Sequence, residues 1–437
     1  MKTEVGVGLI GFGTVGTGVA RILLDNASLI RRRVGIPVNL VRIADLDITR
    51  DRGLTLAPGI LTADAQEVVA DPRVDIVVEL IGGYESAKRV ILDAITRGKQ
   101  VVTANKALLA VHGEDIFAAA ARQGVDLGFE ASVGGGIPVI RALMEGLAAN
   151  HIQSIYGIIN GTSNYILSRM TSEGQRFDVV LEEAKKAGYA EADPTFDVAG
   201  IDSAHKLTIM VSLAYGTPVN FKDVYTEGIT GLTPLDIAYA KEFGFTIKLL
   251  AIAKYFDGEI EARVHPTMVP SASQIAKVDG VYNAIQLVGD AVEDVVLYGR
   301  GAGSMPTGSA VVSDVIAIAR NLMKDATGRV PPASFQQDQR RPLRMRPMEE
   351  ITCLYYIRFM VLDRPGVLSQ IAGVLGRYGI SISSVLQQGR KEGQTVPVVI
   401  MTHMARERDV QNALREINNM PFISEPTTLI RVEGKDE

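Results

Sequence analysis

The chain has 437 residues, so we expect two or three domains rather than one. Hydrophobic residues make up 47% and charged residues 22% of it, a globular profile that excludes long disordered tracts. The formal net charge of -5 gives no general attraction to phosphate backbones, which argues against nucleic acid as a main partner.

The single cysteine, Cys353, excludes an intrachain disulfide framework and a cysteine-rich metal site. The first residues lack the apolar core and cleavage site of a signal peptide, and no apolar run reaches the roughly 18 residues of a membrane span. We therefore expect a cytoplasmic protein with no membrane partner.

The first part of the chain alternates strands with helices. Strand patterns occur at residues 5–10, 38–44, 75–80, 100–103 and 125–130, with helical patterns such as 87–97 and 113–122 between them. This alternation predicts an α/β fold with a Rossmann-type, doubly wound parallel sheet over residues 1–136.

The pattern changes over residues 137–304. Helical patterns at 138–149, 163–170, 179–187 and 201–215 accompany strand patterns at 152–159, 247–256 and 291–298. We expect an α+β domain for substrate binding and dimerisation here. A long helix at 309–323 is expected to return to the first domain, so that residues from about 305 to 325 complete it.

A proline-rich stretch at 325–350 has few periodic apolar positions and is interpreted as a linker. Because few packed positions should cross such a linker, a cut near Arg329 should release a separate C-terminal domain. Over residues 351–437, strands at 354–362, 381–387, 396–402 and 427–432 and two helices give a βαββαβ order, which is ferredoxin-like.

A glycine-rich turn follows the first strand directly and opens a helix. Its G-x-G-x-x-G residues are Gly11, Phe12, Gly13, Thr14, Val15 and Gly16. A turn without a ligand is the alternative, but this position between strand and helix favours dinucleotide binding. Asp45 would favour NAD through the ribose hydroxyls, whereas Arg42, Arg50 and Arg52 would favour the 2′-phosphate of NADP, and the sequence leaves this choice open.

Asp202 and Lys206 lie four residues apart in the helical pattern 201–215, which places both on one face. Alone, such a spacing is more typical of a surface ion pair than of a catalytic pair. Upstream, however, Glu191, Asp193 and Asp197 gather around Pro194, and so much negative charge indicates a polar, cationic ligand.

The stretch Gly188-Tyr189-Ala190-Glu191-Ala192-Asp193-Pro194, continuing to Asp202 and Lys206, resembles the signature region of homoserine dehydrogenases. Further motifs agree in order over about residues 5–325: the glycine-rich turn, Val102-Thr103-Ala104-Asn105-Lys106, Glu130-Ala131-Ser132-Val133-Gly134-Gly135-Gly136-Ile137-Pro138, Asn160-Gly161-Thr162-Ser163-Asn164-Tyr165 and Gly301-Ala302-Gly303. The resemblance implies interconversion of L-homoserine and L-aspartate 4-semialdehyde with NAD or NADP.

The resemblance also implies roles for single residues. Lys206 would transfer the proton, and Asp202 would hold the substrate hydroxyl and orient Lys206. The substrate would further meet Glu191, at its α-amino group, and Gly188, Lys106 and Thr162. The cofactor would meet the turn residues together with Arg42, Asp45, Thr103, Lys106, Gly188 and Gly303.

A monovalent cation is a further implication. Glu130, Val133, Gly135 and Ile137 match the family pattern for a sodium ion held by one carboxylate and mostly backbone carbonyls. Read without the resemblance, Gly134 to Gly136 would be a hinge, and this alternative stays open.

Residues 354–433 resemble an ACT domain, in which Asp363-Arg364-Pro365-Gly366-Val367-Leu368 joins the first strand to a helix. Gly366 lets backbone approach a ligand and the helix N-terminus offers N–H groups to a carboxylate, so an amino acid suits the turn. The family resemblance suggests L-threonine as the effector, feedback regulation in threonine, methionine and isoleucine synthesis, and a homodimer or homotetramer. A purely structural dimerisation module is the alternative.

Two other functions remain open from the sequence alone. One is a different semialdehyde or amino-acid dehydrogenase on the same dinucleotide fold. The other is a catalytically silent sensor of NAD(P) and amino acids, since both ligand-binding parts can act without chemistry. The joint presence of Glu191, Asp202 and Lys206 argues against the silent sensor.

Overall fold

The computed structural model describes residues 2–387 and 394–434. The chain divides into two compact units. Unit 1 comprises Met1–Gly161, Asp202–Val224 and Val281–Leu343, and unit 2 comprises Thr162–Ile201, Tyr225–Gly280 and Arg344–Glu437. Each unit is built from several chain segments.

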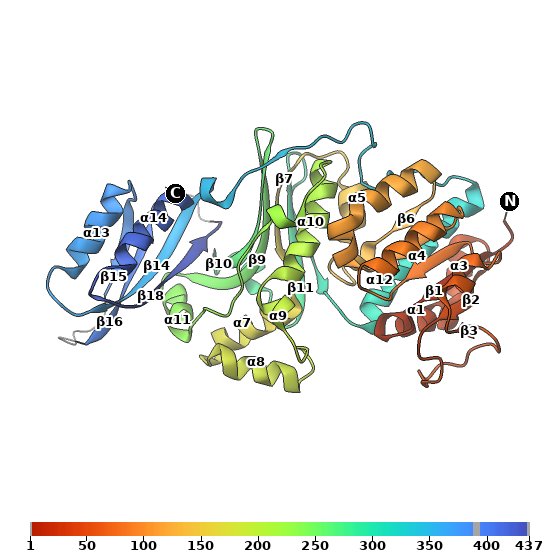
Figure 1. Cartoon of the computed structure of the whole chain (residues 1–437), viewed down its shortest axis with the longest axis horizontal. Helices are drawn as coiled ribbons and strands as arrows, with labels where there is room; N and C mark the ends of the chain where they lie inside the picture. Colours follow the sequence, from red (N-terminus) through yellow and green to blue (C-terminus); the bar gives the residue numbers. More distant parts are fainter. Residues whose placement is uncertain (1, 388–393, 435–437) are drawn as a thin grey trace. The chain divides into compact units, whose positions relative to one another are not determined.

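Unit 1 contains a six-stranded parallel sheet in the order β3-β2-β1-β4-β5-β6 (Figure 1). Its strands are β1 (Val5–Ile10), β2 (Val38–Ala44), β3 (Leu61–Thr62), β4 (Ile76–Glu79), β5 (Gln100–Thr103) and β6 (Leu127–Gly128). All six residues of β1 are buried, as expected for a central strand covered on both faces. The predicted Rossmann-type fold is confirmed.

Helices cover both faces of this sheet. One group is α1 (Thr14–Asp25), α2 (Ala27–Val34) and α12 (Ser304–Lys324), and the other is α3 (Ala65–Ala70), α4 (Glu85–Thr96) and α5 (Lys106–Gln123). Side chains of α1 and α12 share one hydrophobic core with those of β1. The two helices approach closely, because a Cβ atom on Gly18 would lie 2.3 Å from the carbonyl oxygen of Ser304.

The rest of unit 1 includes an antiparallel set β12-β11-β7, with β7 (Ile152–Ile158), β11 (Tyr282–Gly289) and β12 (Glu293–Arg300), and the helix α10 (Ile201–Tyr215). The predicted continuous helix at 138–149 is wrong. It is a short turn, α6 (Val139–Arg141), followed by a π-helical turn at Ala142–Gly146. The widened turn has a physical cause: the N–H of Leu147 donates to the carbonyl of Ala142, five residues earlier.

Unit 2 has a mixed sheet in the order β9-β10-β18-β14-β16-β15. These strands are β9 (Phe245–Phe256), β10 (Glu259–Pro270), β18 (Ile423–Val432), β14 (Thr352–Leu362), β16 (Thr395–Thr402) and β15 (Ile382–Leu386). The helices of the unit are α7 (Gly161–Glu173), α8 (Phe177–Lys186), α9 (Thr195–Val198), α11 (Pro234–Glu242), α13 (Val367–Arg377) and α14 (Glu407–Asn418). The C-terminal part has the predicted βαββαβ order.

The expectation that few packed positions join the C-terminal part to the rest is wrong. Within unit 2, β18 pairs with β10 in parallel, with Thr267 opposite Arg431. Arg358 of β14 lies 2.6 Å from the carboxylate of Asp236 in α11, and both side chains are buried. A strand β13 (Arg344–Met345) inside the predicted linker also pairs with β10. These partners are distant in sequence, so the proline-rich composition of residues 325–350 could not indicate them.

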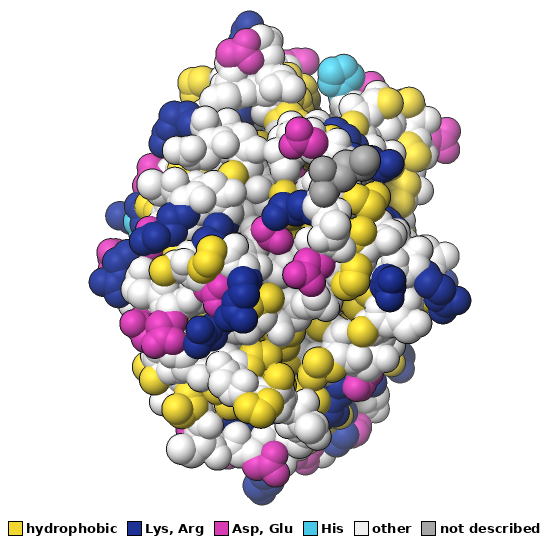
Figure 2. All heavy atoms as spheres, turned by 90° about the vertical axis from the view of Figure 1, so that its right-hand side faces the viewer, with side chains coloured by type: hydrophobic (Ala, Val, Ile, Leu, Met, Phe, Trp, Pro, Cys, Tyr) yellow, Lys and Arg dark blue, Asp and Glu magenta, His cyan; other side chains and the backbone are white. Residues whose placement is uncertain are grey.

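No described helix is both long and apolar enough to cross a membrane. On the face shown in Figure 2, the lysine and arginine side chains are interspersed with aspartate, glutamate and uncharged side chains. The charge on that face is therefore mixed in sign.

Candidate active site

A buried polar cluster lies where α10 meets the end of β7 in unit 1. Lys206 Nζ lies 2.7 Å from Asp202 Oδ2 and donates to the carbonyl oxygen of Ile159 at 2.6 Å. Asn160 Nδ2 donates to the same carboxylate oxygen at 2.9 Å. Lys206 and Asp202 share one face of the helix, as their spacing predicts. Their side chains are only 10% and 6% exposed, so the pair is not a surface ion pair.

Lys106 joins this cluster from α5. Its Nζ lies 2.9 Å from Asp202 Oδ1, and its side chain is 41% exposed. The preceding residue, Asn105, caps the helix by accepting the N–H of Leu108, which fixes where Lys106 begins its turn. Burial alone would raise the pKa of the Asp202 carboxyl, but the ammonium groups of Lys206 and Lys106 outweigh it, and the pKa lies well below its usual range.

The glycine-rich turn has the geometry that a pyrophosphate needs. Gly11 has a φ of 100° and a Cβ there would lie 2.7 Å from the backbone of Leu80, while a Cβ on Gly16 would lie 2.1 Å from the carbonyl oxygen of Gly11. Gly13 faces open space, and as the N-cap of α1 it has no side chain that occupies the free N–H groups. The residues therefore fit a dinucleotide.

Asp45 and Arg52 are brought together beside this turn. Asp45 Oδ2 accepts the N–H of Phe12 at 2.6 Å, and Asp45 Oδ1 lies 3.1 Å from Arg52 Nη2. Arg52 Nε donates to the carbonyl of Phe12, and its guanidinium stacks over that ring, 4.6 Å from the centroid. Arg42 instead pairs with Glu67 and Asp71, at 3.2 and 3.6 Å.

Two more residues predicted to contact the cofactor are Thr103, whose side chain is hydrogen-bonded within unit 1, and Gly303, whose backbone has a positive φ. The Thr103 hydroxyl donates to Glu79 Oε2 at 2.6 Å, and Glu79 accepts the N–H of Ile81. Gly303 has a φ of 123° at the start of α12. The next residue, Ser304, donates its hydroxyl to the carbonyl of Thr14 at 2.7 Å, so Gly303 lies beside the glycine-rich turn.

The predicted substrate residues Gly188, Glu191 and Thr162 belong to unit 2. Gly188 follows α8 with a φ of 74°, and Glu191 is exposed in the loop that continues to α9. The Thr162 hydroxyl, in the first turn of α7, donates to the carbonyl of Tyr189 in this loop at 2.8 Å. The segment 188–197, which we call the acidic loop, is thus joined to the first turn of α7.

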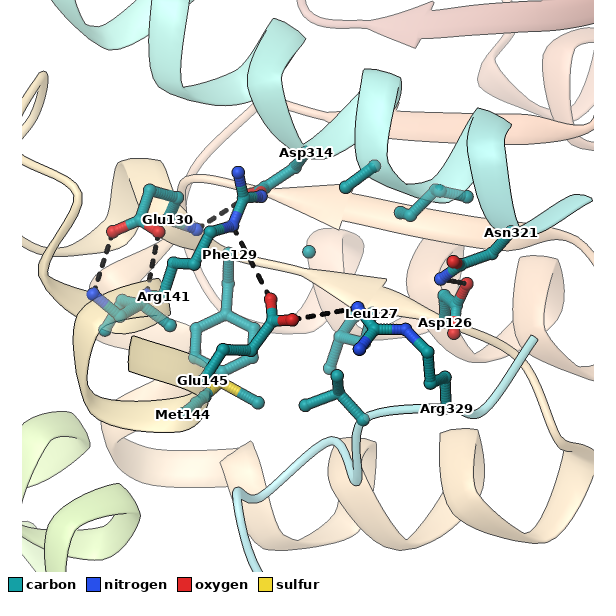
Figure 3. Close-up of a pocket in the computed structure, with 15 residues that line it drawn as sticks. Asp126, Leu127, Phe129, Glu130, Arg141, Met144, Glu145, Asp314, Asn321 and Arg329 are labelled. Atoms are coloured by element: carbon teal, nitrogen blue, oxygen red, sulfur yellow. Dashed lines mark hydrogen bonds and ion pairs between the residues drawn. The ribbon is translucent and has the colours of Figure 1, made fainter. Parts of the chain in front are cut away.

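The predicted cation residues have partners of another kind. Figure 3 shows the carboxylate of Glu130 directed at the first turn of α6, where it accepts the N–H groups of Ile140 and Arg141 at 2.8 and 2.9 Å. The carbonyl of Ile137 accepts the N–H of Val139, and Val133 and Gly135 lie in the loop between. Among the described residues, no three His, Cys, Asp or Glu side chains cluster as metal ligands. The structure gives no support to the sodium site.

Glu130 borders a small cavity of about 80 Å³. Figure 3 shows Arg141 between Asp314 of α12 and Glu145, and Arg329 directed at Glu145. The N–H of Glu130 donates to Asp314 at 2.8 Å. Burial and the neighbouring Glu130 raise the pKa of Asp314 to about 7. Asp314 therefore ties the segment after β6 to α12.

Sequence reasoning missed three members of these clusters. Asn160 is the first residue of the motif at 160–165, but the sequence indicated no role for its side chain. The sequence also indicated no role for the carbonyl of Ile159 or the carboxylate of Asp314. The motif itself was the available signal for Asn160, because an amide at a strand end can reach a neighbouring helix. Neither a backbone carbonyl nor a lone aspartate in a helix carries such a signal.

Comparison with known proteins identifies the relatives. The chain matches the family models for homoserine dehydrogenase over residues 138–316, its NAD-binding domain over 11–130 and the ACT domain over 355–422. It is 48% identical over 430 residues to a homoserine dehydrogenase of Neisseria gonorrhoeae, covering 98% of this chain and 99% of the relative. A solved homoserine dehydrogenase of Thiobacillus denitrificans aligns with a TM-score of 0.93 at 47% identity, over 98% of both chains. A hyperthermophilic archaeal homoserine dehydrogenase in complex with NADPH aligns with a TM-score of 0.62 at 27% identity, over 72% of this chain and 97% of that one.

Proposed function

The chain belongs to the homoserine dehydrogenase family of oxidoreductases, and on that premise we propose that Lys206 moves the proton in the interconversion of L-homoserine and L-aspartate 4-semialdehyde. The observation that carries this proposal is the buried cluster of Lys206, Asp202 and Asn160. An amine held by two hydrogen bonds at a defined point suits general acid–base chemistry.

In the oxidation direction, Lys206 as a neutral amine takes the proton of the substrate hydroxyl; in the reverse direction its ammonium returns a proton to the aldehyde oxygen. Asp202 would orient Lys206 beside the substrate hydroxyl, whose single hydrogen goes to Lys206. One carboxylate faces two ammonium groups, those of Lys206 and Lys106, at 2.7 and 2.9 Å. Repulsion between the two ammonium groups opposes the effect of the carboxylate on the charge of either amine.

A nicotinamide dinucleotide in this site would supply the hydride chemistry. The glycine-rich turn and the N-terminus of α1 would hold its pyrophosphate, and the NADPH complex of the archaeal relative supports a phosphorylated cofactor. Asp45, Arg52 and Gly303 would contact it near the turn, and Thr103 would shape the site through Glu79. Arg42, which pairs with Glu67 and Asp71, has the weakest support as a cofactor residue.

Recognition of the amino-acid end of the substrate falls to unit 2. Glu191 would bind the α-amino group through a charge-assisted hydrogen bond, and Thr162 the carboxylate. Their joint support is the hydrogen bond that joins the first turn of α7 to the loop carrying Glu191. Gly188 lets the backbone turn into this loop.

Absorbance at 340 nm tests the proposal directly. We expect NAD(P)H to form when the protein is mixed with L-homoserine and cofactor, and not with aspartate, malate or glutamate analogues. Glu191→Gln should raise KM for homoserine. Equal rates with homoserine and with the analogues would contradict the proposed substrate.

We also propose that an amino-acid end product, L-threonine, regulates the enzyme through the C-terminal ACT domain. A cavity of about 310 Å³ lies at the turn before α13, lined by Asp363, Gly366, Gln387 and Val398 among others. Gly366 begins α13 with a φ of 88°, and no side chain caps the helix. Its free N–H groups would receive the carboxylate of the effector.

Matched variants at one position test this regulation. Gly366→Asp adds bulk and a negative charge where the carboxylate docks, whereas Gly366→Asn adds similar bulk without the charge and tolerates positive φ. Threonine should inhibit the parent chain and inhibit Gly366→Asp least, with uninhibited activity preserved. Equal inhibition of all three proteins would place the effector elsewhere or leave the domain a role in assembly alone.

A further inference from the structure

Lys248 of β9 is a buried lysine outside the site described above. Its side chain is 1% exposed. Its Nζ donates to the carbonyl of Val278 at 2.6 Å and to Asp279 Oδ1 at 3.1 Å, and it lies 3.5 Å from Asn164 Oδ1. The ammonium therefore joins three chain segments of unit 2.

Asn164 completes this junction. It lies in the first turn of α7, and its Nδ2 donates to the carbonyls of Val278 and Gly280 at 3.0 and 2.9 Å. One helical turn later, the hydroxyl of Ser168 accepts the N–H of Gly280 at 3.0 Å. Lys248 and Asn164 together fasten the start of α7 to β9 and to the segment 278–280.

The same first turn of α7 holds the acidic loop. Besides the bond from Thr162 to the carbonyl of Tyr189, Ser163 donates its hydroxyl to the carbonyl of Asp197 at 2.9 Å. The rings of Tyr165 and Tyr189 lie 4.8 Å apart. Glu191 is two residues from Tyr189, so movement of this turn would move Glu191.

Burying an ammonium is costly, and burial lowers the pKa of Lys248 while Asp279 opposes that effect. An apolar side chain of similar length would avoid this cost, and the carboxylate of the exposed Asp279 would stay in contact with water, but the carbonyl of Val278 would lose a donor. What the methyl group of a methionine cannot do is bind the three acceptors in fixed directions. The position of the turn is therefore the property that Lys248 determines.

We propose that Lys248 is a positioning residue for substrate recognition, which acts through Asn164 and the first turn of α7 to place Thr162 and the loop of Glu191. The inference rests on the proposed function, in which Glu191 binds the α-amino group of homoserine. Lys206 has its own contacts to Asp202 and Ile159 within unit 1.

The test is the kinetics of Lys248→Met. Because a hydrogen bond to a charged group contributes roughly 10- to 150-fold to binding, we expect KM for homoserine to rise at least about tenfold. kcat should stay within about threefold of the parent, and the Kd of the cofactor should not change. The matched control is Lys254→Met on the same strand, which removes an ion pair with Glu433 and should leave KM unchanged.

A deaminated analogue separates the possible failures. 4-Hydroxybutanoate lacks the α-amino group but keeps the carboxylate that Thr162 would bind, so in Lys248→Met its Ki should rise less than KM for homoserine rises. If the parent binds the analogue as well as it binds homoserine, the role of Glu191 in the proposed function fails. If the parent discriminates and Lys248→Met keeps the parental KM, or if Lys254→Met changes kcat and KM as much as Lys248→Met does, the role of Lys248 is overturned.

A second variant covers the case in which Lys248→Met does not fold. Asn164→Ser leaves Lys248 paired with Asp279 but removes the amide that holds Val278 and Gly280. It should raise KM for homoserine with little change in kcat. A parental KM in a folded Asn164→Ser protein would equally overturn the proposal.

Discussion

Replacing Lys206 by methionine removes the ammonium while keeping most of the length of the side chain. The partners left behind indicate how much the fold should lose. Asp202 remains 2.9 Å from Lys106 and still accepts from Asn160, so its charge stays compensated. The carbonyl of Ile159 loses its donor from Lys206, which costs about 1–3 kcal/mol in a buried place. The folded protein should therefore survive the change.

The catalytic loss should be much larger than the loss of stability. General acid–base groups contribute about 100- to 10,000-fold to a rate, so kcat of Lys206→Met should fall by at least about 100-fold. The cofactor should bind as before, because Lys206 is held by Asp202 and Ile159, whereas the glycine-rich turn would hold the cofactor.

Steady-state assays at 340 nm, fluorescence titration with NADPH and thermal unfolding measure these three properties. Thr208→Val is the control on the same helix, since it removes a buried hydroxyl bonded to the carbonyl of Ala204. It should change stability slightly and kcat little. A Lys206→Met protein that keeps more than about a tenth of the parental kcat would remove Lys206 from proton transfer.

Asp45→Asn should raise the ratio of kcat/KM for NADP to that for NAD, because it removes a negative charge and releases Arg52 from its ion pair; a constant ratio would refute this. A chain ending at Leu343 should not fold, because buried Asp236 would lose its partner Arg358. Breaking a buried pair costs about 3–5 kcal/mol, out of a typical free energy of unfolding of about 5–15 kcal/mol. A truncated protein that is folded by circular dichroism and active in the 340 nm assay would contradict this. Burial and the nearby Arg431 hold the pKa of His265 far below 6.5, so only the unfolded chain takes up this proton as the pH falls below 6.5. The free energy of unfolding of the parent should therefore fall by about 1.4 kcal/mol per pH unit more than that of His265→Gln. Urea unfolding at pH 7, 6 and 5 measures the two slopes, and parallel slopes would show that His265 is not responsible.

Local pattern was enough to predict the first sheet and part of the geometry of the candidate site. β1 is an apolar run followed by a glycine-rich turn, and the i,i+4 spacing of Asp202 and Lys206 correctly places them on one face. Spacing carries no information on burial, which is why the pair could not be distinguished from a surface ion pair. The contact with Lys106 needs the fold, since it joins residues on α5 and α10.

Strand β10 shows why other parts could not be predicted. One face of this strand carries Glu261, Arg263 and His265, all buried, so the strand lacks the hydrophobic signal of a core strand. Arg263 pairs with Glu261 and with Glu433 of the C-terminal part, and these partners make its burial tolerable. A partner so distant in sequence cannot be identified from a local stretch of residues. The same limitation explains why residues 325–350 were incorrectly predicted to be a linker with few packed positions.

The pairing of β18 with β10 has a consequence for the order in which the protein is made on the ribosome. β9 and β10 emerge early and can form their antiparallel pair at once. β18 comes after every other strand of the unit, yet lies between β10 and β14. Until it is synthesised, β10 lacks its partner strand at Thr267 and Met268, and Arg263 lacks the carboxylate of Glu433. Since open edges recruit other chains, the nascent protein should depend on chaperones or slow translation through this interval, and a stalled chain should aggregate.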